Sequence, residues 1–118
     1  MATNYYDEFQ KWAEGFCASN DGEPVDGEYY DMPGVTVYKT HKKPLEGKGR
    51  IEINCVSPEA QEHFFWKYEI TLDDLESNTY KHLLLQSDGQ LVETYGKNVS
   101  NVDEATASQI LRQLTELS

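Results

Sequence analysis

The chain has 118 residues, enough for one domain around one hydrophobic core, and we expect a single domain over residues 1–118. Apolar residues make up 38% of it and aromatic residues 12%, so the composition does not indicate intrinsic disorder. The formal net charge of −11 argues against binding to nucleic acid or to anionic membranes, which both need Lys and Arg to meet phosphates. A charge of this sign can steer the chain towards basic partners, or it can serve solubility alone.

Residues 4–19 are predicted to form an amphipathic helix. Its apolar side chains recur at the three-to-four spacing of one helical face, and charged residues take the other side. Asn4 can cap this helix, and Asp7 suits the positive end of its dipole. The face consists of Tyr5, Phe9, Trp12, Ala13, Phe16 and Cys17.

Residues 19–34 are predicted to be a long acidic loop, because Gly and Pro break every periodicity there. Its carboxylates suggest calcium, but the spacing does not fit an EF-hand and Pro24 interrupts it, so a solvated loop is the alternative. Tyr29 and Tyr30 lie within this loop. Tyrosine joins apolar area to a hydrogen-bonding tip, so both are candidates for partner binding, or for anchors that fold back.

Three strands are predicted next, over residues 35–41, 50–56 and 62–72, each with the alternation or composition of a pleated strand. In the third strand two sets of side chains alternate. We expect one set to face the core and the other, led by Phe65, to occupy the second face of the sheet. The core set is Phe64, Trp66, Tyr68, Ile70 and Leu72.

Asp88 and Gly89 predict a hairpin between two further strands, because Gly tolerates the positive φ of a two-residue turn. A two-residue turn would pair Leu85 with Val92 on one face and Leu84 with Glu93 on the other. On that second face it would also pair Gln86 with Leu91 and His82 with Tyr95.

A closing helix is predicted over residues 102–117, with an apolar stripe and with Asn101 and Glu104 as a capping box. The expected fold is therefore α+β: an antiparallel sheet of about five strands, with the N-terminal and C-terminal helices on one face. The opposite face is then either open to solvent or used to bind a partner. Phe65, Leu84, Leu91 and Tyr95 are its candidate residues for a partner or a homodimer.

Catalytic and metal-binding patterns are lacking. His41, His63 and His82 stand at no metal-ligand spacing, and no nucleotide-binding or nucleophile motif occurs, so we expect no cofactor, no metal and no catalytic residue. The chain has no apolar run that could span a membrane and no basic, apolar leader, which predicts a cytoplasmic protein. Cys17 and Cys55 are then expected to be reduced and buried.

The order of elements resembles that of the class I type III secretion chaperones, through a helix, three strands, an interruption, two strands and a helix. This resemblance covers most of the chain but rests on no residue motif, and the interruption at 73–79 is shorter than the family's middle helix. It implies a small acidic dimer that holds an unfolded protein segment against apolar grooves.

The order also resembles the frataxin fold, in which two helices pack on an antiparallel sheet. Asn54, Pro58 and Gln61 match the family's N-x-x-x-P-x-x-Q spacing, whereas His63 stands where the family has Trp. The resemblance implies that Asp7, Glu8 and Glu14 would face iron.

The sequence as a whole predicts a protein-binding module without catalytic activity, similar to a chaperone, an adaptor or an inhibitor, with a protein partner that has a basic surface. One alternative is a metal-responsive acidic protein of frataxin-like architecture. The other is a small-ligand carrier with a pocket between sheet and helices, lined by Trp12, Trp66 and Tyr68.

Overall fold

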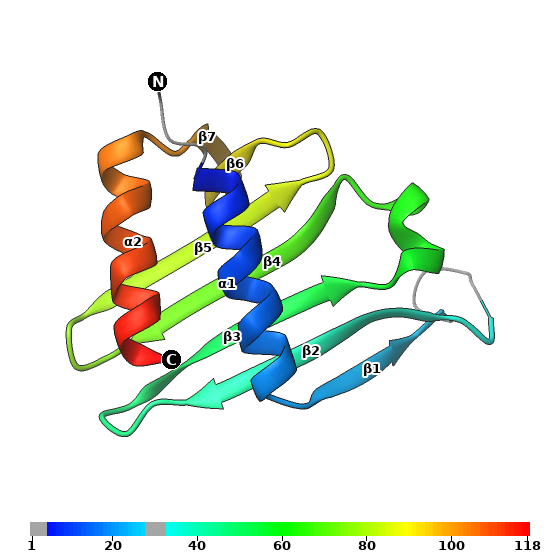
Figure 1. Ribbon diagram of the computed structural model, residues 1–118, viewed down its shortest axis with the longest axis horizontal. Helices are drawn as coiled ribbons and strands as arrows, with labels where there is room; N and C mark the ends of the chain where they lie inside the picture. Colours follow the sequence, from blue (N-terminus) through cyan, green and yellow to red (C-terminus); the bar gives the residue numbers. More distant parts are fainter. Residues whose placement is uncertain (1–4, 28–32) are drawn as a thin grey trace.

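The computed structural model describes residues 5–27 and 33–118 of the chain. They form an α+β fold in which an antiparallel sheet packs against an N-terminal and a C-terminal helix (Figure 1). The strands follow one another in the sheet in the order β1-β2-β3-β4-β5-β6-β7, so every strand pairs with its neighbours in sequence. The elements are α1 (Tyr5–Ser19), β1 (Gly22–Asp26), β2 (Thr36–Pro44), β3 (Gly49–Val56), the 3₁₀ helix η2 (Pro58–His63), β4 (Trp66–Asp74), β5 (Thr79–Gln86), β6 (Leu91–Tyr95), β7 (Asn98–Asn101) and α2 (Glu104–Leu117).

The main core lies between the two helices and one side of the sheet, which we call the helix face. Both helices cross this side in Figure 1, and their apolar stripes pack against alternate residues of the three central strands. Neither described helix has the length and apolarity that a membrane span requires. The core contains Tyr6, Phe9, Ala13 and Phe16 of α1, Ile51 and Ile53 of β3, Ile70 and Leu72 of β4, Leu83 and Leu85 of β5, and Ala107, Ile110 and Leu114 of α2.

The sheet has seven strands among the described residues, and the predicted number of about five is wrong. The first additional strand, β1, lies in the segment predicted to be loop. Its Pro24 is tolerated because β1 is an edge strand, where a missing N–H need not break the ladder. The second, β7, is a four-residue strand at the opposite edge, too short to give a clear alternation.

The cap of α2 also differs from the prediction. Asp103, not Asn101, is the N-cap, and its side chain accepts a hydrogen bond from the backbone N–H of Thr106 at 2.7 Å. Asn101 is the last residue of β7. The predicted cap of α1, Asn4, lies outside the described residues.

The start of β4 departs from simple alternation. Tyr68, Ile70 and Leu72 belong to the main core or pack against it, as predicted, but Phe64 and Trp66 do not. The register shifts between Trp66 and Tyr68, and a bulge of this kind redirects the side chains before it. Phe64 and Trp66 instead join a second cluster, which consists of Val37, Tyr38, Val56, Ala60, Phe64 and Trp66.

The β5–β6 hairpin has a longer turn than predicted. The N–H of Gln86 donates to the carbonyl of Gln90 at 2.9 Å, and Gly89 has a φ of +89°. The turn between the bonded residues Gln86 and Gln90 therefore has three residues, where two were predicted. This extra residue shifts the register of the hairpin by one position. Leu85 pairs with Leu91 and Leu84 with Val92, so Leu91 moves to the helix face.

Gly22 lies against a buried histidine where β1 pairs with β2. A Cβ on Gly22 would come within 2.5 Å of Cε1 of His41, whose side chain is buried. His41 Nδ1 lies 2.6 Å from the carbonyl oxygen of Asn20, which fixes the ring in place. The chain thus needs glycine here, where it leaves α1 and enters the sheet.

Candidate functional site

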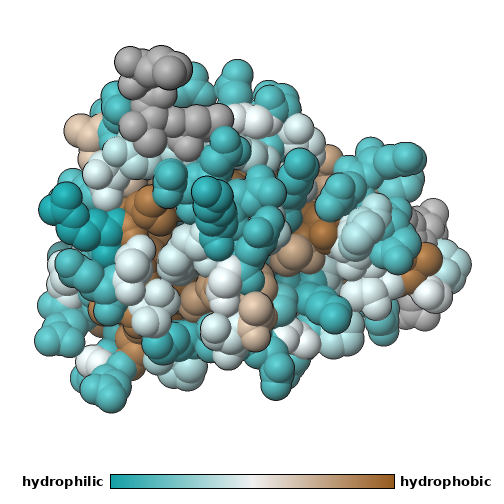
Figure 2. Space-filling view, in the orientation of Figure 1, coloured by the Kyte–Doolittle hydropathy of each residue, from teal (hydrophilic) through white to brown (hydrophobic). Residues whose placement is uncertain are grey.

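The side of the sheet opposite the helices, which we call the open face, carries a different set of residues from the helix face. Strand alternation and the observed register assign these residues to it. The helix side of the molecule is largely hydrophilic, with separate small apolar spots (Figure 2). The open face includes Tyr38, Thr40 and Lys42 of β2, Arg50, Glu52, Asn54 and Val56 of β3, Glu69, Thr71 and Asp73 of β4, Tyr80, His82 and Leu84 of β5, Val92 and Thr94 of β6, and Val99 and Asn101 of β7.

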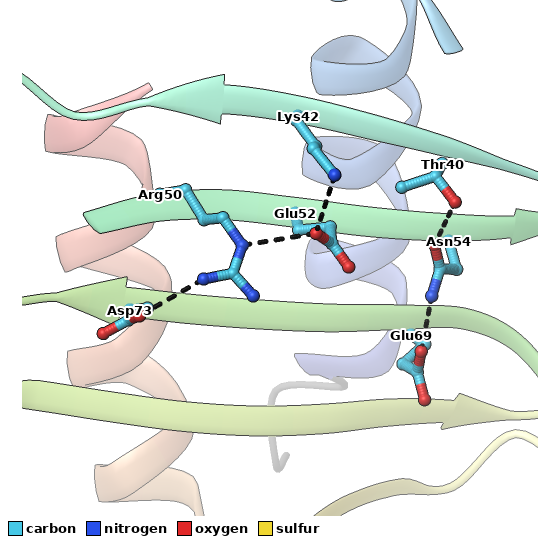
Figure 3. Close-up of polar contacts among 7 residues, drawn as sticks. All are labelled: Thr40, Lys42, Arg50, Glu52, Asn54, Glu69 and Asp73. Carbon is cyan, nitrogen blue, oxygen red and sulfur yellow. Dashed lines mark hydrogen bonds and ion pairs between the residues drawn. The ribbon is translucent and has the colours of Figure 1, made fainter. Parts of the chain in front are cut away.

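A chain of side-chain hydrogen bonds crosses five strands on the open face. Thr40 Oγ1 donates to Asn54 Oδ1 at 2.7 Å, and Asn54 Nδ2 donates to Glu69 Oε1 at 2.5 Å (Figure 3). The second carboxylate oxygen of Glu69 lies 3.1 Å from His82 Nε2, and the other ring nitrogen of His82 bonds to the hydroxyl of Thr94. Each partner orients the next, so the network fixes the His82 ring on the sheet.

The Glu69 carboxylate is the charged centre of this network. The hydrogen bond from His82 lowers its pKa, a partial burial opposes that effect, and the hydrogen bond from Asn54 lowers the pKa further. The net direction is downward, so the network favours the ionised form of Glu69.

A second polar group lies beside this chain at the β2–β3 end of the open face. Arg50 bridges Glu52 and Asp73 with N···O distances of 3.3 Å to each, and Lys42 lies 3.8 Å from Glu52 (Figure 3). These side chains are partly exposed, and such ion pairs contribute little to stability. Two positive and two negative side chains therefore balance one another in this group.

Two exposed tyrosines, Tyr80 of β5 and Tyr95 of β6, lie near the β7 edge of the sheet. The register shift that moves Leu91 to the helix face puts Tyr95 on that side as well, and not on the open face as predicted. Tyr80, His82, Thr94, Tyr95 and Gly96 line a depression of about 300 Å³, which we call the tyrosine pocket. Tyr80 is 62% exposed and Tyr95 is 81% exposed, whereas His82 is held at the pocket by Glu69 and Thr94. Exposed tyrosines beside a fixed polar group are typical of recognition surfaces.

The structure places the predicted partner-binding residues in different surroundings. Tyr95 lines the tyrosine pocket, and Phe65 is exposed in the turn that precedes β4, after the 3₁₀ helix. Leu84 is on the open face but is buried, and Leu91 packs against the main core. Tyr29 and Tyr30 lie outside the described residues.

Tyr80 and His82 are site residues that sequence reasoning missed. The alternation of "TYKHLLLQ" puts Tyr80 and His82 on the same side of β5, opposite the core residues Leu83 and Leu85. This alternation alone predicts that Tyr80 and His82 share a face. Which β6 residues lie beside them depends on the register of the β5–β6 hairpin. The two-residue turn placed Tyr95 opposite His82, whereas the observed register extends to place Thr94 there.

The two cysteines do not form a reactive pair in this structure. Both thiols are free and partly buried. Burial raises the pKa of Cys17 to about 12, and the neighbouring Cys55 adds to that rise. Burial also raises the pKa of Cys55. Thiols of this kind are poor nucleophiles, because the reactive form is the thiolate.

The residues considered for metal or ligand binding do not converge. Within residues 5–27 and 33–118, no three His, Cys, Asp or Glu side chains form a group that could hold a metal ion. Trp12 and Tyr68 pack against the main core, while Trp66 belongs to the second cluster, so the three do not line one pocket. A cleft of about 540 Å³ lies beside Trp12, at the end of α1.

Comparison with known proteins gives no further guidance: no family model matches the chain, and no significant match was found among curated proteins or solved structures.

Proposed function

We propose that this chain is a cytoplasmic protein-binding module without catalytic activity, which binds a basic partner protein through the tyrosine pocket. It would act as a chaperone, adaptor or inhibitor does, by holding or covering a segment of its partner. The observation that carries this proposal is the tyrosine pocket itself, where the exposed Tyr80 and Tyr95 line one depression together with a histidine that Glu69 and Thr94 hold in place. Tyrosine is enriched among the residues that dominate binding energy at protein interfaces.

The charge of the chain supports a basic partner. The net charge of −11 favours encounter with a positive surface and opposes binding to polyanions. Tyr80 and Tyr95 can then receive a Lys or Arg side chain against their rings, a contact that gains strength when water is excluded. The rate at which the two proteins associate would then fall with added salt, whereas the strength of the contact at the rings would fall when the tyrosines are replaced.

The test compares two variants with the wild type. The double variant Tyr80→Ser/Tyr95→Ser removes both rings of the pocket, and Phe65→Ser removes a ring elsewhere that is as exposed as that of Tyr80. A pull-down from the native host with mass spectrometry identifies a partner, whose purified form is then titrated against all three proteins. We expect the double variant to weaken binding at least about tenfold and Phe65→Ser to leave it unchanged.

Two results would contradict the proposal. Binding that survives the double variant but fails in Phe65→Ser would place the interface at the turn before β4. Binding that does not weaken between about 50 mM and 500 mM NaCl would remove the electrostatic part of the argument. Circular dichroism and thermal unfolding of each variant show whether a loss of binding reflects a loss of fold.

A further inference from the structure

The two edges of the sheet differ in their protection against pairing with another strand. β1 and β7 are the edge strands, since they stand first and last in the sheet order. β1 carries Pro24, which cannot donate to a ladder, and the charged Glu23 and Asp26, all of which oppose edge pairing. β7, with the sequence NVSN, has no charge and no proline, and all four of its residues are exposed.

The direction of the free backbone groups on β7 follows from one observed hydrogen bond. The N–H of Val102 donates to the carbonyl of Leu91 at 3.4 Å, just beyond the last pair of the β6–β7 ladder. Hydrogen-bonded pairs alternate along an antiparallel ladder, so Ser100 and Asn98 direct their N–H and C=O groups towards β6. Val99 and Asn101 therefore direct theirs outward, to the open edge.

This edge lies next to the tyrosine pocket. Val99 pairs with Thr94 and Asn98 pairs with Tyr95, and both partners line the pocket. A strand added at β7 would lie about 4.8 Å further out, so a long side chain from it could cross β7 to the part of the tyrosine pocket that β6 lines. Strand addition combines in this way backbone hydrogen bonds for affinity with a side-chain pocket for specificity.

The charge around the edge indicates which strand fits. Residues 87–104, which include β6 and β7, hold four acids, Asp88, Glu93, Asp103 and Glu104, against one base, Lys97. A basic strand complements this charge, whereas a second copy of a chain with net charge −11 would bring like charges together.

We infer that β7 is a docking edge for an extended basic segment of a partner protein, which adds to the sheet as an eighth strand and places a Lys or Arg side chain in the tyrosine pocket. This inference rests on the proposed function, because it takes the pocket as the place where the partner's side chain binds. Beyond the proposed function, it states that the backbone of the partner also binds, through hydrogen bonds to β7. The bound segment of the partner is therefore extended and not helical.

The experiment uses proline to remove one outward N–H from β7. Val99→Pro removes the donor that faces the open edge and leaves the bonds of Ser100 and Asn98 to β6 in place. Val99→Leu is the matched control, because it changes the side chain and keeps the N–H. The probe is a capped peptide of about eight alternating Arg and Val residues, and its Glu-Val counterpart tests charge.

We expect the Arg-Val peptide to bind the wild type and Val99→Leu alike, and to bind Val99→Pro at least about tenfold more weakly. The Glu-Val peptide should not bind. Chemical shifts of the Val99 and Asn101 amides should move on binding in the wild type. The Asn101→Pro variant removes the second outward N–H and should weaken binding as well, which guards against a local defect at position 99.

The outcomes separate the two proposals. If Tyr80→Ser/Tyr95→Ser abolishes peptide binding while Val99→Pro and Asn101→Pro keep it, the pocket binds the partner but the docking edge is wrong. If no variant changes binding, both proposals fail. If sedimentation shows a dimer of the wild type that Val99→Pro dissociates, the edge pairs with a second copy, and the assignment to a basic partner is overturned.

Discussion

Glu69 and His82, on adjacent strands, are joined across the open face by a contact of 3.1 Å between Oε2 and Nε2. They are not directly opposite each other in the ladder, since Glu69 pairs with Leu84 and His82 pairs with Thr71. The contact is therefore diagonal, and it connects the polar residues of β2 and β3 to those of β6.

Glu69→Gln should lower the stability of the protein at neutral pH, and the difference in stability from the wild type should shrink in acid. The pKa of Glu69 is lowered from its ordinary value of 4.5, so its contribution is present above that pH and is lost as the pH falls through the folded pKa. We expect a loss of about 1–2 kcal/mol at pH 7 and a smaller difference at pH 3, measured by urea unfolding. The exposed Glu62→Gln is the control, and an equal gap at both pH values would contradict this account of Glu69.

Two glycine substitutions should have opposite effects on stability. Gly22→Ala places a methyl group 2.5 Å from the buried His41 ring, and we expect it to destabilise the protein by about 1–3 kcal/mol. Gly15→Ala, within α1, meets no atom within 4 Å and should stabilise it by about 0.5–1 kcal/mol. Thermal unfolding compares them. A neutral Gly22→Ala would mean that the His41 ring can move aside.

Phe64→Ser and Phe65→Ser should separate a packing residue from an exposed one. The ring of Phe64 lies 5.3 Å from that of Trp66 in an edge-to-face contact, whereas Phe65 is 63% exposed. We expect Phe64→Ser to cost about 1–3 kcal/mol and Phe65→Ser less than about 0.5 kcal/mol. Two hydrogen bonds from Ser87 survive either change, because its N–H donates to the carbonyl of Phe65 and its hydroxyl donates to the carbonyl of Phe64. Unfolding of Phe65→Ser at room temperature would show that its ring is covered in the native protein.

The two thiols should react slowly while the protein is folded. With a pKa of about 12, Cys17 is a thiolate in about one molecule in ten thousand at pH 8. Ellman's reagent should therefore label neither Cys17 nor Cys55 appreciably in the native protein, and should label both at once in denaturant. The Cys17→Ser and Cys55→Ser variants assign the signals, and rapid native labelling of either thiol would contradict the burial of that site.

The apolar pattern predicted the α+β fold, the antiparallel sheet and the helices at both ends, because these patterns reflect burial directly. It could not predict β1, whose Pro24 and acids have low strand propensity; pairing with β2 decides its conformation. The bulge between Trp66 and Tyr68 and the three-residue turn after Gln86 each shift the pattern by one residue. Each shift carries aromatic or apolar residues to another face.

The candidate site was less accessible to sequence reasoning than the fold. Tyr95 was predicted to bind a partner, but its neighbours in the pocket depend on a register that the Asp88–Gly89 pair alone does not determine. The chain of hydrogen bonds from Thr40 to Thr94 needs the correct alignment of five strands. No local motif encodes such an alignment.

The position of α1 has a consequence for how the chain folds during synthesis. The hydroxyl of Tyr6 donates to the carbonyl of Gln86 at 2.7 Å, so the first helix is bonded to a residue 80 positions later. The strands between them pair only with sequence neighbours, so the hairpins can close in turn as the chain emerges. The apolar stripe of α1, with Phe9 and Phe16, has no complete surface to cover until β5 has left the ribosome. A nascent chain that stops before β5 should therefore expose this helix, and be the form most prone to aggregate or to recruit a chaperone.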